Sequence, residues 1–504
     1  MPQTTRPRAR PSIPTASHKP SAPQQPSAAD LDPRRWLALS VVLMAAVLGV
    51  LDFFILNIAI PSIQRGLPAT FADIQLMIAG YGLTYAVFLI TGGRLGDIYG
   101  RKRMFMVGVA GFTFASTLCG LAPGPGTLIA ARVLQGTTGA VMFPQVLSII
   151  QVSFPPRERS IAFGIFGMVL GAGSFAGNVL GGMLIDWNLF GLTWRPIFLV
   201  NLPVGIIALL AAAFVVHESR SSRAPRLDLG GVALATLGLF LLIYPLVQGH
   251  AAGWPMWAFL CLAASIPVLV SFILYERRVS NSGGSPLMEL SLFRDKVFVS
   301  GLLAALAFYG GMSTFFLTIT LFLQEGLGLT PRATGLIFIP FALGFLMASS
   351  AGIKLTKRLG SRAINLGTSL MIVGLIGLIV LARTHGIAVT SPELIPWLLI
   401  YGIGQGFVVP TLISTVLSGI PSYAAGSASG VLTTVQQIAF AMGVAAIGSI
   451  YSTIVGVQPE PQDYAHGIGI ALFFNMGLLA ATFGLALLLP RSTLGAHALR
   501  HFDA

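Results

Sequence analysis

The sequence predicts an all-α membrane protein that crosses the bilayer many times. Of its 504 residues, 55% are hydrophobic and only 9% are charged, whereas a soluble globular protein has roughly a quarter of its residues charged. A chain with so few charges cannot cover a water-facing surface. Apolar runs of about 20 residues recur along it, the length a helix needs to cross a hydrocarbon core of about 30 Å. The strands of a membrane barrel would instead give short alternating segments.

The first element is a basic tail at 1–35, rich in Pro, Ser, Ala and Arg. It has almost no large apolar residues, so we expect it to be disordered, and it lacks the apolar stretch of a cleaved secretory signal. Fourteen apolar spans follow, at roughly 36–60, 74–93, 104–122, 127–151, 161–185, 196–216, 229–248, 255–275, 298–323, 333–353, 363–383, 394–417, 427–451 and 465–489.

The distribution of basic residues predicts how the chain is oriented in the membrane. If the N-terminus lies in the cytoplasm, the segments on that side hold 25 of the 30 Lys and Arg residues, and the segments on the opposite side hold four. Membrane proteins keep Lys and Arg in their cytoplasmic loops, so this division supports that orientation. With an even number of spans both termini are cytoplasmic. We expect a multi-pass protein of the bacterial cytoplasmic (inner) membrane.

A weak internal repeat predicts how the spans are grouped. LGDIYGRKR (95–103) aligns with LTKRLGSRA (355–363) after a shift of 260 residues, and VMFPQVLS (141–148) aligns with FVVPTLIS (407–414) after a shift of 266. Two related halves of six helices, with two extra helices between them, explain both shifts. The predicted organisation is a tail, an N-terminal half, two linking helices, a C-terminal half and a cytoplasmic tail, at 1–35, 36–217, 218–297, 298–490 and 491–504.

Only two charged residues lie well inside the predicted spans, Asp52 in the first and Arg132 in the fourth. A charge in hydrocarbon costs about 2.5–3.5 kcal/mol or more, so such residues face a partner or a cavity. At 1.5 Å of rise per residue they lie about 12 Å and about 8 Å from the outer ends of their helices, a similar depth that allows pairing directly or through water. Asp52 then either exchanges protons while Arg132 tunes its pKa, or the two form a permanent ion pair that only joins the helices.

Uncharged polar residues and glycines inside the spans are candidates for a substrate cavity and for close helix packing. Gln135 lies on the same helical stripe as Arg132, where it braces the arginine or contacts substrate. Small residues recur through the fifth span at a spacing that allows close packing, or a sliding surface for a transport cycle. The cavity candidates are Asn57, Tyr81, Gln135, Asn178 and Gln405, with interhelical hydrogen bonds as their alternative role, and the packing glycines are Gly136, Gly177, Gly181 and Gly182.

Several classes of function are not supported by the sequence. The basic residues behind the net charge of +13 lie in short loops between apolar runs, so no nucleic-acid partner is expected. We find no GxxxxGK[ST] nucleotide-binding loop, no metal-ligand cluster and no catalytic cluster or soluble output domain of an enzyme or sensor. We expect no cofactor and no metal, so the energy comes from a proton or other ion gradient, or from the substrate gradient. Cys119 and Cys261 lie in apolar runs and are expected to be reduced.

Five motifs together resemble those of the major facilitator superfamily, in particular its fourteen-helix drug:proton antiporter branch. The resemblance covers about residues 36–490. The motifs are LDFFILNIAIP (51–61), GRLGDIYGRKR (93–103), RVLQGTTGA (132–140), WRPIFLVNLPVG (194–205) and ASGVLTTVQQ (428–437). One residue departs from the branch, because Asn178 follows Gly177 where its motif in the fifth span has a proline before the Gly181-Gly182 pair.

The resemblance implies a monomeric exporter of small amphipathic compounds, driven by proton antiport and working by alternating access between two six-helix halves. An uncoupled facilitator or an uptake carrier is the alternative. The resemblance also implies a charge relay that latches the second helix to the second half in the outward-facing state; a local ion pair between Asp97 and Arg101 is the other interpretation. The latch residues are Gly93, Asp97, Gly100, Arg101 and Lys102.

Overall fold

The computed structural model describes residues 33–221, 227–418, 420, 425–456 and 460–489. This part of the chain is helical, without strands, and contains fourteen helices long and apolar enough to cross a membrane. The predicted all-α class with fourteen spans is therefore confirmed. The tails predicted at 1–35 and 491–504 lie almost wholly outside the described residues.

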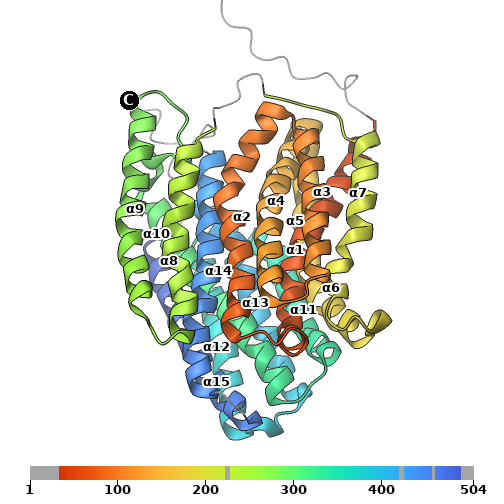
Figure 1. The fold of residues 1–504 in the computed structure, drawn as a ribbon, viewed down its shortest axis with the longest axis vertical. Helices are drawn as coiled ribbons and strands as arrows, with labels where there is room; N and C mark the ends of the chain where they lie inside the picture. Colours follow the sequence, from red (N-terminus) through yellow and green to blue (C-terminus); the bar gives the residue numbers. More distant parts are fainter. Residues whose placement is uncertain (1–32, 222–226, 419, 421–424, 457–459, 490–504) are drawn as a thin grey trace, which may run out of the picture.

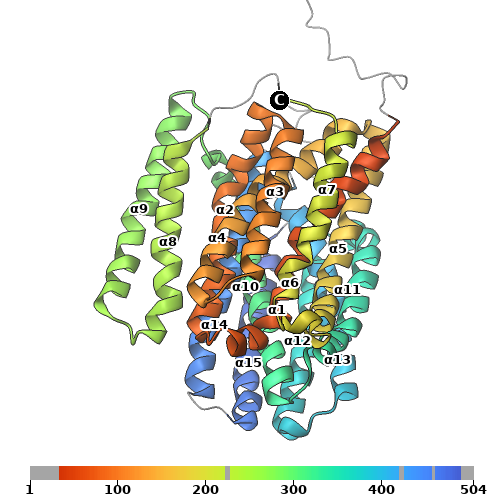
Figure 2. The same ribbon diagram turned by 45° about the vertical axis from the view of Figure 1, so that its right-hand side comes forward.

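The first six spans are the red-to-yellow helices at the centre and right of Figure 2, where α11 and α13 also lie on the right. The sixth, predicted at 196–216, is divided at Val200 into two helices that continue one another. The helices are α1 (Arg35–Gly66), α2 (Phe71–Tyr99), α3 (Arg101–Gly120), α4 (Pro125–Ser153), α5 (Pro156–Asp186), the 3-10 turn η2 (Leu189–Gly191), α6 (Pro196–Leu199) and α7 (Asn201–Val215).

The two helices in the middle of the chain form a hairpin at the edge of the molecule. They are α8 (Leu229–Ala251) and α9 (Met256–Asn281), which pack on one another and stand to one side in both ribbon views (Figures 1 and 2). Only α8 makes extensive contact with the body, through α2 and α14 (Ala425–Val455). These helices are central in the sequence and peripheral in space.

The last six spans follow a short 3-10 turn, η3 (Leu290–Arg294). Their first helix, α10, ends in a π turn that continues its axis. The elements are α10 (Lys296–Leu321), η4 (Phe322–Gly326), α11 (Pro331–Leu359), α12 (Arg362–Thr384), η5 (Gly386–Ala388), α13 (Ser391–Val416), α14 (Ala425–Val455) and α15 (Pro461–Leu487).

Polar residues at the helix ends explain where several helices begin. Thr70 accepts a hydrogen bond from the Asp73 N–H at 3.1 Å, and the Asp73 carboxylate accepts from the Thr70 N–H at 2.9 Å, a capping box that starts α2. Asp295 accepts from the Val297 N–H at 2.7 Å and starts α10. Gly100 separates α2 from α3 with a φ of +111°, which side chains other than glycine rarely adopt.

The two halves meet most closely at the end of the bundle where α1 passes into α2, here called the α1–α2 end. Buried residues of α1 from Ala38 to Leu48 belong to a hydrophobic cluster formed only by α1–α7 and the residues flanking them. From Ile55 to Ile63 they belong to a cluster that also includes α10–α15. Gln324 donates to the Ile58 carbonyl at 2.8 Å across this junction. The halves thus share a core at the α1–α2 end, whereas toward the opposite, α2–α3 end the buried residues of α1 pack only within their own half. A third cluster joins α2 and α14 with the hairpin.

Two pairs of helices form the seams between the halves, α2 with α14 and α5 with α11. In the first seam Gln75 donates to the Val444 carbonyl at 2.8 Å. In the second seam a Cβ at Gly335 would lie only 2.7 Å from the Asn178 carbonyl oxygen, so the absence of a side chain lets α11 approach α5.

Candidate functional site

A dry ion pair lies inside the N-terminal helices. Arg132 Nη1, on α4, donates to Asp52 Oδ2, on α1, at 2.5 Å. The two side chains are 1% and 0% exposed. Removing two ions from water costs several kcal/mol for each, so the pair needs further hydrogen bonds to be stable.

Two side-chain amides supply these hydrogen bonds. Gln135, one helical turn after Arg132, accepts from Arg132 Nη1 at 2.7 Å and donates to Asp52 Oδ1 at 2.8 Å. Asn201, at the start of α7, donates to the same Oδ1 at 3.1 Å. Asp52 therefore accepts hydrogen bonds from three side chains on two other helices. This is the hydrogen bonding expected of an ionised carboxylate, which can only accept.

The other side of the Arg132 guanidinium is held by α2. Arg132 Nε donates to the Met77 carbonyl at 3.4 Å, and the guanidinium carbon lies 4.3 Å from the centre of the Tyr81 ring. A cation over an aromatic face in a desolvated place gains about 2 kcal/mol. Asn201 also donates to Ser116 of α3 at 2.9 Å. The ion pair thus connects five helices of the N-terminal half.

The sequence predicted four members of this site and missed two. Asp52, Arg132, Gln135 and Tyr81 come together, and Asp52 and Arg132 pair directly rather than through water. The missed residues, Asn201 and Ser116, are buried uncharged polar residues within apolar runs. Asn201 lies in the motif WRPIFLVNLPVG, where a lone amide among apolar side chains is the available signal.

The remaining cavity candidates lie apart from the ion pair. Asn57 donates to the Phe53 carbonyl of its own helix at 3.5 Å. Gln405 is buried in α13 and donates to the sulfur of Met312 at 3.6 Å. Asn178 is 1% exposed, and neither polar atom of its side chain has a hydrogen-bond partner in the structure. Their roles as substrate contacts stay predictions.

The glycines predicted to pack helices all lie at close helix contacts. A Cβ on Gly136 would overlap the Tyr81 carbonyl, one on Gly177 would lie 2.9 Å from the Leu51 carbonyl, and one on Gly181 would lie 2.6 Å from the Ile55 side chain. Gly182, on the adjacent face of α5, packs against Pro331 of α11. Helix α5 therefore approaches α1 and the second half closely on two adjacent faces.

In this structure Asp97, Arg101 and Lys102 of the charged segment at 93–103 contact the first half and the residues that directly follow it, whereas Arg94 donates to carbonyls at 285–286, ahead of α10. Arg101 donates to the Asp97 carboxylate at 2.9 Å, and Lys102 Nζ donates to the Ala213 carbonyl at 2.7 Å. The Glu218 carboxylate accepts from the Lys102 N–H at 3.1 Å and so caps α3. A Cβ on Gly100 would lie 2.6 Å from that carboxyl carbon, and one on Gly93 would only touch Pro144 at 3.7 Å. These are local contacts, and the latch to the second half stays a prediction.

Aromatic side chains of both halves meet beside Asp52. Phe53 packs on Phe440 with ring centres 4.9 Å apart, and Phe54 packs on Phe316 at 5.7 Å. Tyr309 completes the group, 5.6 Å from Phe440. Phe53, Phe54 and Phe440 are only partly buried. This aromatic group joins the residues that follow Asp52 to α10 and α14.

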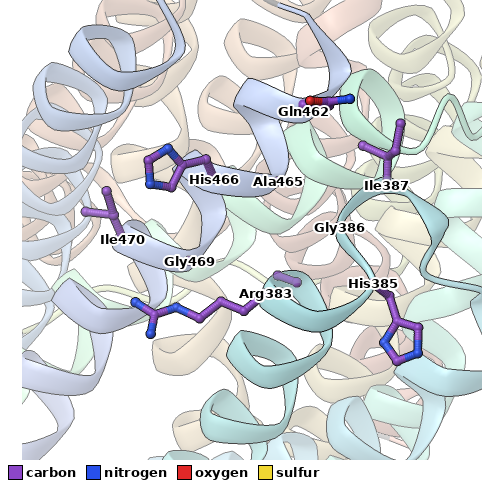
Figure 3. A pocket seen from close by; sticks show the side chains of 10 residues that line it. Arg383, His385, Gly386, Ile387, Gln462, Ala465, His466, Gly469 and Ile470 are labelled. Carbon is purple, nitrogen blue, oxygen red and sulfur yellow. The ribbon is translucent and has the colours of Figure 1, made fainter.

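A separate polar groove of about 570 Å³ lies between the end of α12 and the start of α15 (Figure 3). Arg383, His385 and His466 line it together with Gln462. Figure 3 shows Arg383 and His466 reaching along the same side, and Arg383 lies 4.9 Å from the Phe473 ring. None of its lining residues belongs to the ion-pair site.

Fourteen membrane-length helices among the described residues, five of them connected by a buried ion pair, define a polytopic membrane protein. The chain belongs to the Major Facilitator Superfamily, whose family model matches residues 42–444. The resemblance found in the motifs is thereby confirmed, and the protein is a transporter and not an enzyme.

Two bacterial relatives and one solved structure extend this result. A probable actinorhodin transporter of Streptomyces coelicolor is 42% identical over 84% of this chain and 74% of its own. A tetracenomycin C resistance and export protein of Streptomyces glaucescens is 33% identical over 88% of this chain and 81% of its own. A bacterial homolog of the human lysosomal transporter Spinster has the same fold, with a TM-score of 0.67 at 17% identity, covering 91% of this chain and 97% of that one.

Proposed function

We propose that this transporter exports small amphipathic compounds from the cytoplasm in exchange for protons. The observation that carries the proposal is the Asp52 carboxylate, held by Arg132, Gln135 and Asn201 where water does not reach it. The direction of transport is supported by relatives named for resistance and export. The substrate class is supported by the aromatic group beside this site.

The proton step is a competition between a proton and Arg132 for Asp52. When Asp52 takes up a proton, the guanidinium loses its counter-charge and keeps Gln135 Oε1, the Met77 carbonyl and the Tyr81 ring as partners. The ties from Asp52 to α4 and α7 then weaken together. A proton thereby favours one helix arrangement over another, which is the differential interaction that coupled transport requires.

Alternating access is supported by the unequal contact between the halves. Their cores merge at the α1–α2 end, whereas toward the α2–α3 end the buried residues of α1 pack only within the N-terminal half. In the orientation given by the basic residues, the α2–α3 end faces the cytoplasm and the joined α1–α2 end faces outward. A rocking motion that opens the joined α1–α2 end must break the hydrogen bond from Gln324 to the Ile58 carbonyl. The aromatic group stays close to the axis of this rotation.

The substrate seat in this proposal is the aromatic group of Phe53, Phe54, Tyr309, Phe316 and Phe440. Partly buried rings from both halves give a flat apolar ligand large contact area, and their faces attract a cation. The location next to Asp52 lets substrate and proton act on the same stretch of α1. The proposal further places the protein as a monomer in the bacterial cytoplasmic membrane, with both termini in the cytoplasm.

The test uses purified protein in liposomes with a pH indicator and a panel of cationic and neutral amphiphiles. We expect some compounds to cause proton release from the wild-type protein. Asp52→Asn should abolish this release, because the amide cannot exchange a proton, while the protein still inserts and folds. The matched control is Asp186→Asn, the same change at an exposed carboxylate at the end of α5, which should keep the release.

Other outcomes would identify the alternative functions. Substrate flux through the wild-type protein with no proton movement would overturn the coupling and favour an uncoupled facilitator, giving weight to Asn178 in place of the proline. Full proton release by Asp52→Asn would remove Asp52 from the mechanism. Counterflow measured in both directions separates export from uptake.

A further inference from the structure

A second group of buried acids lies where the α8–α9 hairpin meets α2. Asp228 immediately precedes α8 and is 7% exposed, and Glu276 lies near the end of α9 and is 0% exposed. Asp228 Oδ2 and Glu276 Oε1 both lie beside Gly231, and the two carboxyl groups interact there. Gly231 makes room for this contact, because a Cβ there would lie 2.7 Å from Asp228 Oδ2 and would overlap Glu276 Oε1.

Three of the four carboxyl oxygens have backbone donors. Asp228 Oδ1 accepts from the Gly231 N–H at 2.8 Å, and Oδ2 accepts from the Leu287 N–H at 3.2 Å. Glu276 Oε2 accepts from the Met288 N–H at 3.0 Å. The fourth oxygen, Glu276 Oε1, is fully buried without a donor in the structure and faces the Asp228 carboxyl. A buried acceptor in this position calls for a hydrogen atom between the two groups.

The charges around the pair lead to the same conclusion. The Arg94 guanidinium of α2 lies close to both acids and donates to the Ser285 carbonyl at 3.0 Å and to the Pro286 carbonyl. One positive and two negative charges leave an excess of one negative charge, and both carboxyl groups are buried. The other titratable or charged neighbours on the described elements are Tyr275, hydrogen-bonded to Asp228, the exposed Arg277 and Arg278, and Glu289, which accepts from Ser291.

Two carboxylates in contact cannot both stay ionised at low cost, and they relieve the repulsion by sharing one proton. A proton between Asp228 Oδ2 and Glu276 Oε1 gives the donorless oxygen a partner and brings the group, with Arg94, to zero net charge. We propose that Asp228 and Glu276 form a proton-binding site, separate from Asp52, that holds a single proton between the two carboxyl groups.

The acidic pair joins the hairpin to the segment at 285–289. The acids hold the Leu287 and Met288 amides, Arg94 holds the carbonyls just before them, and the Glu289 N–H donates to Ser427 of α14 at 3.1 Å. The two carboxyl groups and Arg94 therefore hold the hairpin against the segment that leads into α10. Loss of the shared proton adds a negative charge to the buried group and loosens this segment. The site does not involve Asp52 and does not depend on the proposed export.

Infrared spectroscopy of the whole protein in lipid nanodiscs tests the proposal directly. At neutral pH a protonated carboxyl group gives a C=O stretching band that carboxylates lack. We expect one such band in the wild-type protein. Glu276→Gln should remove it, because the amide donates the hydrogen bond to Asp228 without a shared proton. Asp228→Asn, which leaves Glu276 to accept from the new amide, should remove it as well.

Two matched variants locate the band. Asp52→Asn should leave it unchanged, which separates this site from the proton exchange proposed above, and so should Glu289→Gln, the same change at a neighbouring, partly exposed acid. A wild-type spectrum without a protonated carboxyl band would overturn the proposal. This spectrum is expected if a bound cation, and not a proton, neutralises the two acids. A band that survives in both Glu276→Gln and Asp228→Asn would overturn it too.

Discussion

The Asp52–Arg132 pair allows a stability prediction that is independent of transport. Arg132→Leu removes the only charged partner of Asp52 in the described structure and leaves a buried carboxylate with two neutral donors, Gln135 and Asn201. Breaking a buried pair in this way costs about 3–5 kcal/mol of the free energy of unfolding. Asp52→Asn strands the guanidinium in the same dry place and should cost a similar amount.

The double variant separates the pair from its surroundings. If the two substitutions acted independently, their costs would sum to about 6–10 kcal/mol. Because the second substitution removes the charge that the first one strands, we expect the double variant to be no less stable than either single variant. Its loss then reflects only the hydrogen bonds of Gln135, Asn201 and the Met77 carbonyl that are left incomplete.

Reversible unfolding in mixed micelles by increasing denaturing detergent measures all four proteins under one condition. Agreement of the double variant with the sum of the single ones, within about 0.5 kcal/mol, would refute the reasoning, because independent sites add in that way. Such additivity would mean that water reaches each charge separately.

Two further predictions follow from packing and from an exposed ion pair. Gly136→Val should lower the free energy of unfolding by about 1–3 kcal/mol, because the new side chain overlaps the Tyr81 carbonyl. The control Gly164→Ala should be neutral or slightly stabilising, because no atom lies within 4 Å of the new Cβ. Thermal unfolding of both variants measures the difference. Arg35 donates to Glu158 at 2.8 and 3.0 Å and lowers the pKa of that carboxyl, so the pair should stabilise the protein above the ordinary glutamate pKa and lose this contribution as the pH falls through the lowered value. Glu158→Gln should remove that part of the pH dependence of unfolding, and an unchanged profile would contradict the assignment.

The sequence predicts the helices and the ion pair because both depend on strong local signals. A run of about 20 apolar residues can only be a span, and a charge within it needs a partner. The similar depths of Asp52 and Arg132 follow from their positions in two helices. Asn201 and Ser116 carry no such signal, because whether an uncharged side chain faces the pair depends on how α7 and α3 are rotated, and this rotation is set by the packing of the whole half.

The second acidic site was missed for a different reason. The predicted span at 229–248 begins one residue after Asp228, and the span at 255–275 ends one residue before Glu276. Both acids were therefore counted with the loops. Span ends are the least certain part of a prediction from apolar runs. Their burial depends on the return of residues 285–288 over the end of the hairpin, and the sequence gives no sign of that contact. Likewise, the contact of Glu218 with the start of α3 could not be predicted. Glu218 accepts a hydrogen bond from the Arg103 N–H, and 115 residues separate the two in the sequence.

The position of the α8–α9 hairpin makes the two sides of the transporter unequal toward the lipid. The hairpin lies along the α2–α14 seam, and an apolar cavity of about 190 Å³ lies between it, α2 and α14. The α5–α11 seam has no comparable cover among the described helices. A compound dissolved in the bilayer therefore meets bare helix–helix contact on the α5–α11 side and a two-helix barrier on the other. Toward the lipid the two seams are therefore unlike surfaces, one a closely packed pair of helices and the other covered by the hairpin.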